Sequence, residues 1–107
     1  MSGPDVRIAV VDLGSNSVRL LLCDGIDDGG PSGERLTRVT GLRRGAGPDG
    51  AIAREALERL DACLAAYAER VVAFAPSRVV VVGTSAVRDA PNRALVADLV
   101  GTRLGVT

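Results

Sequence analysis

A short polar segment follows the first apolar run of the sequence and has the residue types of an anion site. Its four members can all offer backbone or side-chain donors: Gly14, Ser15, Asn16 and Ser17. Glycine permits a positive φ, which lets consecutive amides converge on an anion. Arg19 adds a cation two residues after Ser17. We therefore predict that Gly14, Ser15, Asn16, Ser17 and Arg19 bind phosphate.

Asp12 stands at the carboxyl end of the same apolar run. A carboxylate there can hold a magnesium ion through its water, so we predict Asp12 as the metal residue. Ordinary hairpin chemistry is an alternative explanation, with Gly-Ser-Asn-Ser as a tight turn and Asp12 as a strand cap. Spacing alone leaves both interpretations open.

A second polar segment, at residues 84–92, lies where a predicted strand passes into a predicted helix. Thr84 and Ser85 supply hydroxyls, Arg88 a guanidinium and Asn92 an amide. Ligands collect outside the carboxyl ends of strands in α/β sheets, and a helix N-terminus favours anions. We predict these four residues as further phosphate ligands, with Arg88 forking onto phosphate oxygens. The alternative is a polar turn in which Asp89 caps the helix and Arg88 is solvated or paired.

Apolar and β-branched runs predict the strands that position the two segments. Antiparallel strands are expected at residues 6–12 and 17–23, a loop at the glycine-rich residues 24–33, and a third strand at 34–42. Four consecutive valines predict a strand at 78–83, parallel to the first and covered on both faces. The three antiparallel strands would form a meander.

Two helices are predicted from apolar spacing. The first has its stripe from Ile52 to Val71, with Asp49 capping its start and Pro76 marking the boundary it cannot cross. The second begins near Pro91 and ends at Gly105. The apolar side of the second helix consists of Leu95, Val96, Leu99, Val100 and Leu104. The order of elements predicts an α/β fold.

Composition limits the partners and the chemistry. Thirteen basic and thirteen acidic residues cancel, so no global positive field gathers nucleic acid or a membrane surface, and we expect neither partner. No apolar run approaches the roughly 20 residues needed to span a bilayer. The first residues lack a secretory signal, so a cytoplasmic location is expected. Cys23 and Cys63 are predicted to be buried free thiols, and the absence of histidine argues against a zinc site.

The two polar segments together resemble one known family. Residues 8–20, Ile-Ala-Val-Val-Asp-Leu-Gly-Ser-Asn-Ser-Val-Arg-Leu, are similar to the opening phosphate loop of the exopolyphosphatase and guanosine pentaphosphate phosphohydrolase (Ppx/GppA) family. Residues 84–92 are similar to the family pattern Thr-Ser-Ala-x-Arg-x-Ala-x-Asn. The resemblance covers nearly the whole chain and implies the N-terminal part of a ribonuclease H-like (actin-like ATPase) domain, with residues 1–107 as an incomplete domain.

The resemblance implies a magnesium-dependent hydrolase that removes terminal phosphate from inorganic polyphosphate or guanosine pentaphosphate, two substrates that the sequence does not separate. The family's catalytic glutamate lies in a Ser-Gly-x-Glu-Glu-Ala segment, which does not occur in these 107 residues. We therefore assign no catalytic residue and expect the chain by itself to be inactive. For a full-length form, a homodimer is one assembly to consider. The alternatives are a non-enzymatic phosphate- or nucleotide-binding module, or part of a kinase of the same superfamily.

Overall fold

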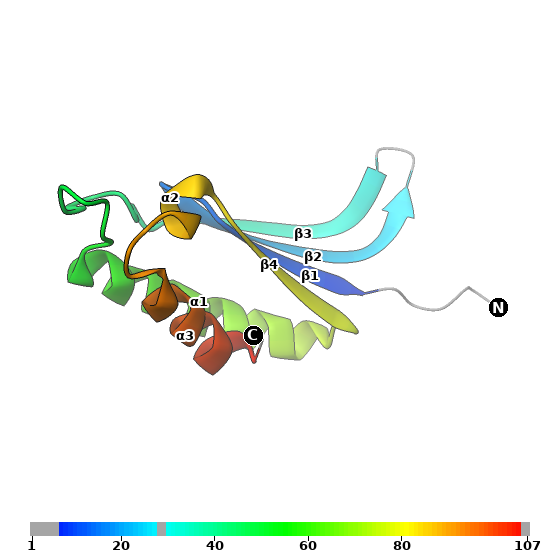
Figure 1. Cartoon of the computed structure of the whole chain (residues 1–107). Coiled ribbons are helices and arrows are strands. Elements are labelled where there is room, and N and C mark those ends of the chain that lie inside the picture. The colour runs from blue at the N-terminus through cyan, green and yellow to red at the C-terminus, as the bar shows by residue number, and fades with distance from the viewer. Residues whose placement is uncertain (1–6, 28–29, 106–107) are drawn as a thin grey trace.

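The computed structural model describes residues 7–27 and 30–105, in which four strands form one mixed sheet (Figure 1). The strands are β1 (Ile8–Leu13), β2 (Ser17–Asp27), β3 (Gly30–Val39) and β4 (Arg78–Gly83). Their order in the sheet is β3-β2-β1-β4. β1 runs antiparallel to β2 and parallel to β4, and β2 runs antiparallel to β3. The predicted meander with one parallel strand is confirmed.

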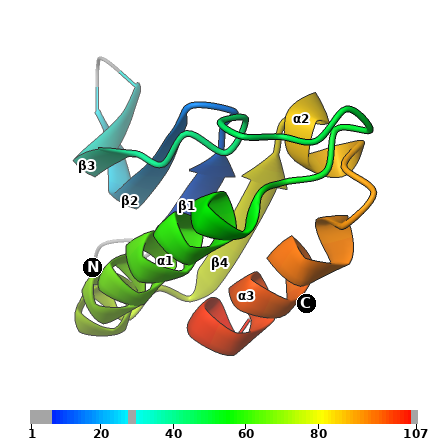
Figure 2. The same cartoon turned by 90° about the vertical axis from the view of Figure 1, so that its left-hand side faces the viewer.

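Two helices cover one face of this sheet, as Figure 2 shows. They are α1 (Arg54–Phe74) and α3 (Arg93–Leu104), and a single helical turn, α2 (Ser85–Arg88), follows β4. Within α1, the predicted apolar stripe is buried at Ala56, Leu60, Leu64, Tyr67 and Val71, whereas its other members Leu57 and Ala68 are partly buried. The buried members recur every three or four positions, which places them on the helix face that meets the sheet. Their burial accounts for the position of α1.

Alternation along the strands divides the sheet into a core face and an open face. Ala9, Val11 and Leu13 of β1 are buried, as are the matching positions of β2. The intervening residues of β1, Val10 and Asp12, are only partly buried. Because successive side chains of a strand point to opposite faces, Asp12 stands on the face that the helices leave open.

Two predictions about the valine strand and the last helix are wrong. β4 is not covered on both faces, because Val80 and Val82 are 38% and 49% exposed. Both long helices lie on the opposite face of the sheet, so neither of them covers the exposed face of β4. Leu95 was expected on the buried side of α3 but is 47% exposed, at the solvent rim of a hollow between α1 and α3.

The predicted loop at residues 24–33 is also wrong, because β2 continues to Asp27 and β3 begins at Gly30, while residues 28 and 29 lie outside the described part. The pairing shifts register between Cys23 and Gly25. Gly33, opposite Cys23, has φ +150°, and a Cβ there would come within 1.7 Å of the Leu22 carbonyl oxygen. Glycine therefore serves an irregular strand pairing here. The third strand ends at Val39, earlier than predicted.

The start of α1 differs from the prediction, whereas both helix ends agree with it. Asp49 does not cap α1, because its Oδ1 accepts a bond from the Ala51 amide at 3.0 Å and closes a turn before the helix. α1 starts after Ala53 and ends with Ala75 in the left-handed conformation, just before Pro76. Gly105, with φ 70°, ends α3 as predicted.

The two cysteines are both free thiols, and their burial differs. Cys63 is buried as predicted, but Cys23 is only half-buried because it lies on the open face of β2. Within residues 7–27 and 30–105, none of the helices is long and apolar enough to span a membrane.

Candidate functional site

The open face of the sheet brings a carboxylate and an arginine side by side near the end of β1. Asp12 is the register partner of Arg19 on β2, and Arg19 is in turn the partner of Thr37 on β3. On the other side, Asp12 is paired with Val82 of β4. Register partners stand on the same face of a sheet at adjacent positions. One row across the four strands therefore carries an anion, a cation and a hydroxyl.

Thr84 lies just beyond the end of β4, two residues after Val82 of this row. Its amide donates to the Leu13 carbonyl at 3.1 Å, and its carbonyl accepts from the amides of Val87 and Arg88 as α2 begins. The Thr84 hydroxyl is buried and has no hydrogen-bond partner among the described residues. A buried polar group without a partner is unusual, and a water molecule, an ion or a ligand would satisfy it. The Thr40 hydroxyl, which does not line the hollow described below, has the same property.

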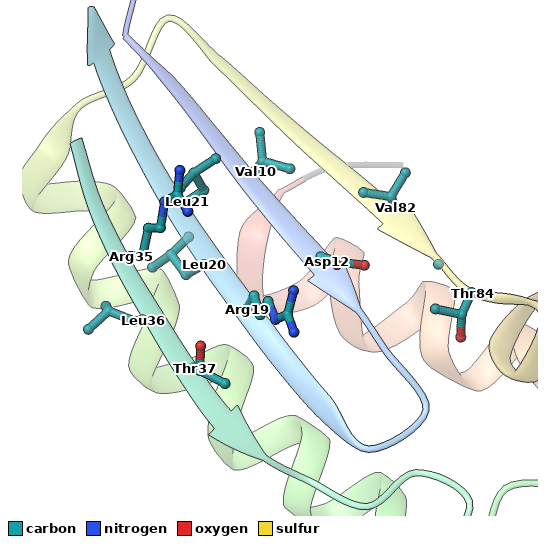
Figure 3. A pocket seen from close by; sticks show the side chains of 11 residues that line it. Val10, Asp12, Arg19, Leu20, Leu21, Arg35, Leu36, Thr37, Val82 and Thr84 are labelled. Carbon is teal, nitrogen blue, oxygen red and sulfur yellow. The ribbon is translucent and has the colours of Figure 1, made fainter. Parts of the chain in front are cut away.

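These residues line an open hollow of about 740 Å³, drawn in Figure 3. Asp12 and Thr84 lie at the ends of neighbouring strands, and Arg19 stands beside Asp12 on β2. The wall continues along β3 with Arg35 and Thr37. Its floor is apolar, with contributions from Val10, Leu21 and Val82. The hollow is therefore lined by two guanidinium groups, those of Arg19 and Arg35, and by one carboxylate, that of Asp12.

The turn between β1 and β2 contains the predicted phosphate-binding residues 14–17. The Gly14 amide donates to the Ser17 carbonyl at 3.0 Å, so the turn is tight. A Cβ on Gly14 would lie 2.7 Å from that carbonyl oxygen, closer than real Cβ contacts allow. Gly14 is not among the glycines with positive φ, so the expected reason for it is wrong. Glycine is needed here for close approach of the backbone.

The segment after β3 holds this turn by its carbonyl groups. The amides of Thr40 and Gly41 both donate to the Asn16 carbonyl, at 3.0 and 2.9 Å. The Arg43 amide donates to the Ser15 carbonyl at 3.3 Å. Because the carbonyl oxygens are turned toward residues 40–43, the turn is fixed from one side while Asn16 remains exposed. This arrangement favours an ordered backbone for anion binding.

The second predicted segment is not brought to the same hollow as a whole. Arg88 lines a separate and mostly apolar hollow of about 470 Å³ between β4 and α3, which adjoins the first at Gly83. The side chain of Ser85 lies outside the described part. Among the residues of this segment whose side chains the structure describes, Thr84 alone lines the hollow that contains Asp12 and Arg19.

Asn92 has a structural partner 40 residues away. Its Oδ1 accepts from the Ile52 amide and its Nδ2 donates to the Ile52 carbonyl, both at 2.9 Å. This pair of bonds ties the start of α3 to the loop before α1 and explains why Asn92 makes no side-chain cap on α3. As phosphate ligands, Asn92 and Arg88 stay predictions.

Sequence reasoning missed three residues around the site: Arg35, Thr37 and Arg59. Arg35 and Thr37 alternate along β3, and a period of two in that strand would have placed them on one face. Only the strand register shows that this face is the one that carries Arg19. Arg59 gave no signal in the sequence, because its partners are backbone carbonyls of Thr40 and Gly41.

The donor set fits a magnesium ion that is bound mainly by phosphate and water. The described residues contain no group of three or more His, Cys, Asp or Glu side chains that could hold a metal. Magnesium is usually bound through one or two carboxylates together with substrate phosphates, rather than by an all-protein cage. Asp12 is one such carboxylate, and it lines the same hollow as the arginine side chains that could bind phosphate. Asp12 is therefore the residue that would hold the ion.

Residues 26–107 match the model of a family described as the Ppx/GppA phosphatase family. Exopolyphosphatase 2 of Mycobacterium tuberculosis is 39% identical over 107 residues, which cover 92% of this chain and 33% of that protein. Guanosine-5'-triphosphate,3'-diphosphate pyrophosphatase of Vibrio vulnificus is 32% identical over 91 residues, which cover 85% of this chain and 18% of that protein. The chain thus spans a third or less of the length of these curated relatives.

Solved structures that resemble this chain come from the same family. The Aquifex aeolicus member of the Ppx/GppA family superposes with a TM-score of 0.81 at 30% identity, covering 95% of this chain and 33% of that one. An exopolyphosphatase from Cytophaga hutchinsonii superposes with a TM-score of 0.82 at 29% identity, covering 94% and 32%. The predicted fold class is confirmed by these structures.

Proposed function

The chain belongs to the Ppx/GppA phosphatase family, and we propose that it forms the phosphate-binding part of a hydrolase that removes the terminal phosphate of inorganic polyphosphate or guanosine pentaphosphate. The observation that carries this proposal is the convergence of Asp12, Arg19 and Thr84, from three neighbouring strands, on one hollow. The names of the relatives from Mycobacterium tuberculosis and Vibrio vulnificus support the two substrate classes.

Three residues of the hollow, Asp12, Arg19 and Thr84, have roles that their chemistry supports, and the adjoining turn adds a fourth contribution. The guanidinium of Arg19 donates two parallel bonds to phosphate oxygens, and such charge-assisted bonds are stronger than neutral ones. The Thr84 hydroxyl gains the partner that it lacks in the protein alone. The amides of residues 15–17 add backbone donors from the adjoining turn. Asp12 would hold magnesium, which neutralises charge on the phosphates and polarises the reacting phosphoryl group.

Hydrolysis needs one further group that these residues do not supply. A water oxygen bonds to the terminal phosphorus, the bond to the bridging oxygen breaks, and the shortened chain leaves with that electron pair. The proton of the water passes to a general base, for which the family resemblance points to a glutamate segment that does not occur in this sequence. We therefore expect the 107-residue chain to bind phosphate chains without turning them over.

Calorimetric titration of the 107-residue chain with tripolyphosphate, in the presence of magnesium, tests the binding. Arg19→Met should weaken binding by about ten- to a hundredfold, because one charge-assisted hydrogen-bonding group is lost. Asp12→Asn should abolish the gain in affinity that magnesium gives. Arg103→Met is the matched control, since Arg103 pairs with Asp61 on the helices.

Two results would count against the proposal. Wild-type protein that does not bind tripolyphosphate would refute the binding role, and so would equal losses in Arg19→Met and Arg103→Met. Sustained release of phosphate from polyphosphate by the 107-residue chain, but not by the Asp12→Asn variant, would show that the base lies within these residues.

A further inference from the structure

Arg59 of α1 is bonded to the segment that holds the phosphate turn. Its Nε donates to the Thr40 carbonyl at 2.6 Å and its Nη2 donates to the Gly41 carbonyl at 3.2 Å. Both bonds are partly buried, and the Thr40 residue itself is 1% exposed. A guanidinium that donates to backbone carbonyls in such surroundings makes strong, charge-assisted bonds. The two bonds therefore attach α1 firmly to the backbone of residues 40–41.

The bonded peptide group continues directly to the turn. The Thr40 carbonyl and the Gly41 amide belong to one peptide group, which accepts from Arg59 and donates to the Asn16 carbonyl at 2.9 Å. The Asn16 carbonyl shares the next peptide group with the Ser17 amide. Hydrogen bonds in such a chain polarise one another, so a positive charge at one end strengthens the donor at the other.

The strand register shows the direction of the Ser17 amide, the last donor in this series of hydrogen-bonded peptide groups. The bond from the Thr40 amide to the Asn16 carbonyl makes residues 16 and 40 a hydrogen-bonded pair, and Ser17 and Val39 are the next register partners. Bonded and non-bonded pairs alternate along an antiparallel ladder, so the Ser17 amide is directed away from β3. It faces the interior of the turn, where the Ser17 carbonyl already accepts from Gly14.

We propose that Arg59 is a positioning residue for the phosphate turn, which fixes the Asn16–Ser17 peptide group and strengthens the Ser17 amide as a donor to a phosphate oxygen. This inference rests on the proposed function of the turn. Arg59 does not line the hollow and does not touch substrate; it acts through the peptide groups of residues 40–41 and 16–17.

The test combines amide proton shifts with phosphate affinity in the 107-residue chain. Arg59→Met removes the charge and both donors but keeps the apolar stem, whereas Arg59→Lys keeps the charge. Arg103→Met removes an arginine that bonds to Asp61 instead. In Arg59→Met, the Gly41 and Ser17 amide protons should shift upfield while amides near α3 do not, and tripolyphosphate affinity should fall about three- to tenfold, the equivalent of one hydrogen bond. Arg59→Lys should restore part of both.

The outcomes separate this inference from the proposed function. If wild-type protein does not bind tripolyphosphate, the proposed function fails and the donor role of Ser17 toward phosphate fails with it, while the amide shifts still decide the link between Arg59 and the turn. Unchanged Gly41 and Ser17 shifts in folded Arg59→Met, or unchanged affinity when the wild type binds, would overturn the inference alone. If Arg59→Met does not fold, Arg59→Lys serves as the test variant. It keeps the charge but loses the pair of guanidinium donors, so smaller changes in the same amide shifts and in affinity are expected, and wild-type values for both would overturn the inference.

Discussion

Replacing Tyr67 by phenylalanine would remove a buried hydrogen bond with almost no change in packing. The Tyr67 hydroxyl donates to the Val18 carbonyl at 2.7 Å, and the two residues are 4% and 0% exposed. The bond joins α1 to the first residues of β2, just after the phosphate turn. A phenyl ring fills nearly the same volume, so the change isolates the hydrogen bond from the hydrophobic core.

The expected loss in the free energy of unfolding is about 1–2 kcal/mol. A typical hydrogen bond contributes about 0.5–1.5 kcal/mol net, and a buried carbonyl that loses a partner adds part of its desolvation cost. For a domain of this size, each kcal/mol lowers Tm by about 4–8 °C. Urea unfolding followed by circular dichroism measures the difference. Val72→Ala on the same helix is the control, because Val72 is 78% exposed and should change stability by less than about 0.5 kcal/mol.

The pH dependence gives a second signature of the same group. Burial raises the pKa of Tyr67 to about 12 from its ordinary 10.0, with smaller contributions from Cys63. Between these two values the unfolded chain releases the phenolic proton while the folded chain keeps it. The stabilisation is therefore complete below pH 10 and is lost as the pH rises toward 12. The advantage of wild type over Tyr67→Phe should shrink in that window.

The sequence contains a single tyrosine, so phenolate absorbance reports Tyr67 alone. Its titration in the folded protein should begin well above pH 10. An ordinary tyrosine titration in folded protein, or a Tyr67→Phe variant with the urea midpoint of wild type, would refute the assignment of a buried, bonded hydroxyl.

Three further predictions concern the turn, the thiols and the core. Gly14→Ala should weaken tripolyphosphate binding at least about tenfold by calorimetry, because a Cβ would lie 2.7 Å from the Ser17 carbonyl oxygen; an unchanged affinity would show that the turn can open without loss. Cys63 should react with a thiol reagent only on unfolding, since burial raises the pKa of its thiol, whereas Cys23 should react in folded protein; equal rates would contradict the burial. Leu64→Ala should cost about 2–5 kcal/mol in urea unfolding, because Leu64 is fully buried, and a loss below about 1 kcal/mol would place Leu64 outside the tightly packed core.

Local features of the fold could be predicted from the sequence. The stripe from Ala56 to Val71 specifies one buried helix face, because the period of its apolar residues shows which side of the helix is apolar. The unbroken valine run predicted the strand β4 but not which of its faces is covered. Gly105 and Pro76 mark helix ends for local conformational reasons. Prediction from local sequence patterns failed where the local composition favoured a loop but strand pairing in the folded protein formed a hairpin. The glycine-rich residues before Gly33 looked like a loop, yet strand pairing extends the hairpin through the described ones.

The sequence by itself was enough to predict candidate phosphate and metal ligands: Asp12, the turn at residues 14–17, Arg19 and Thr84 all lie next to apolar runs whose ends are locally encoded. Tertiary structure alone decided which of them meet. Arg19 stands beside Asp12 because of strand register, Asn92 is bonded to Ile52 across 40 residues, and Arg59 reaches the turn through the backbone of residues 40–41. The physical reason is that backbone partners carry no residue-specific signal, and register is set by the pairing of whole strands.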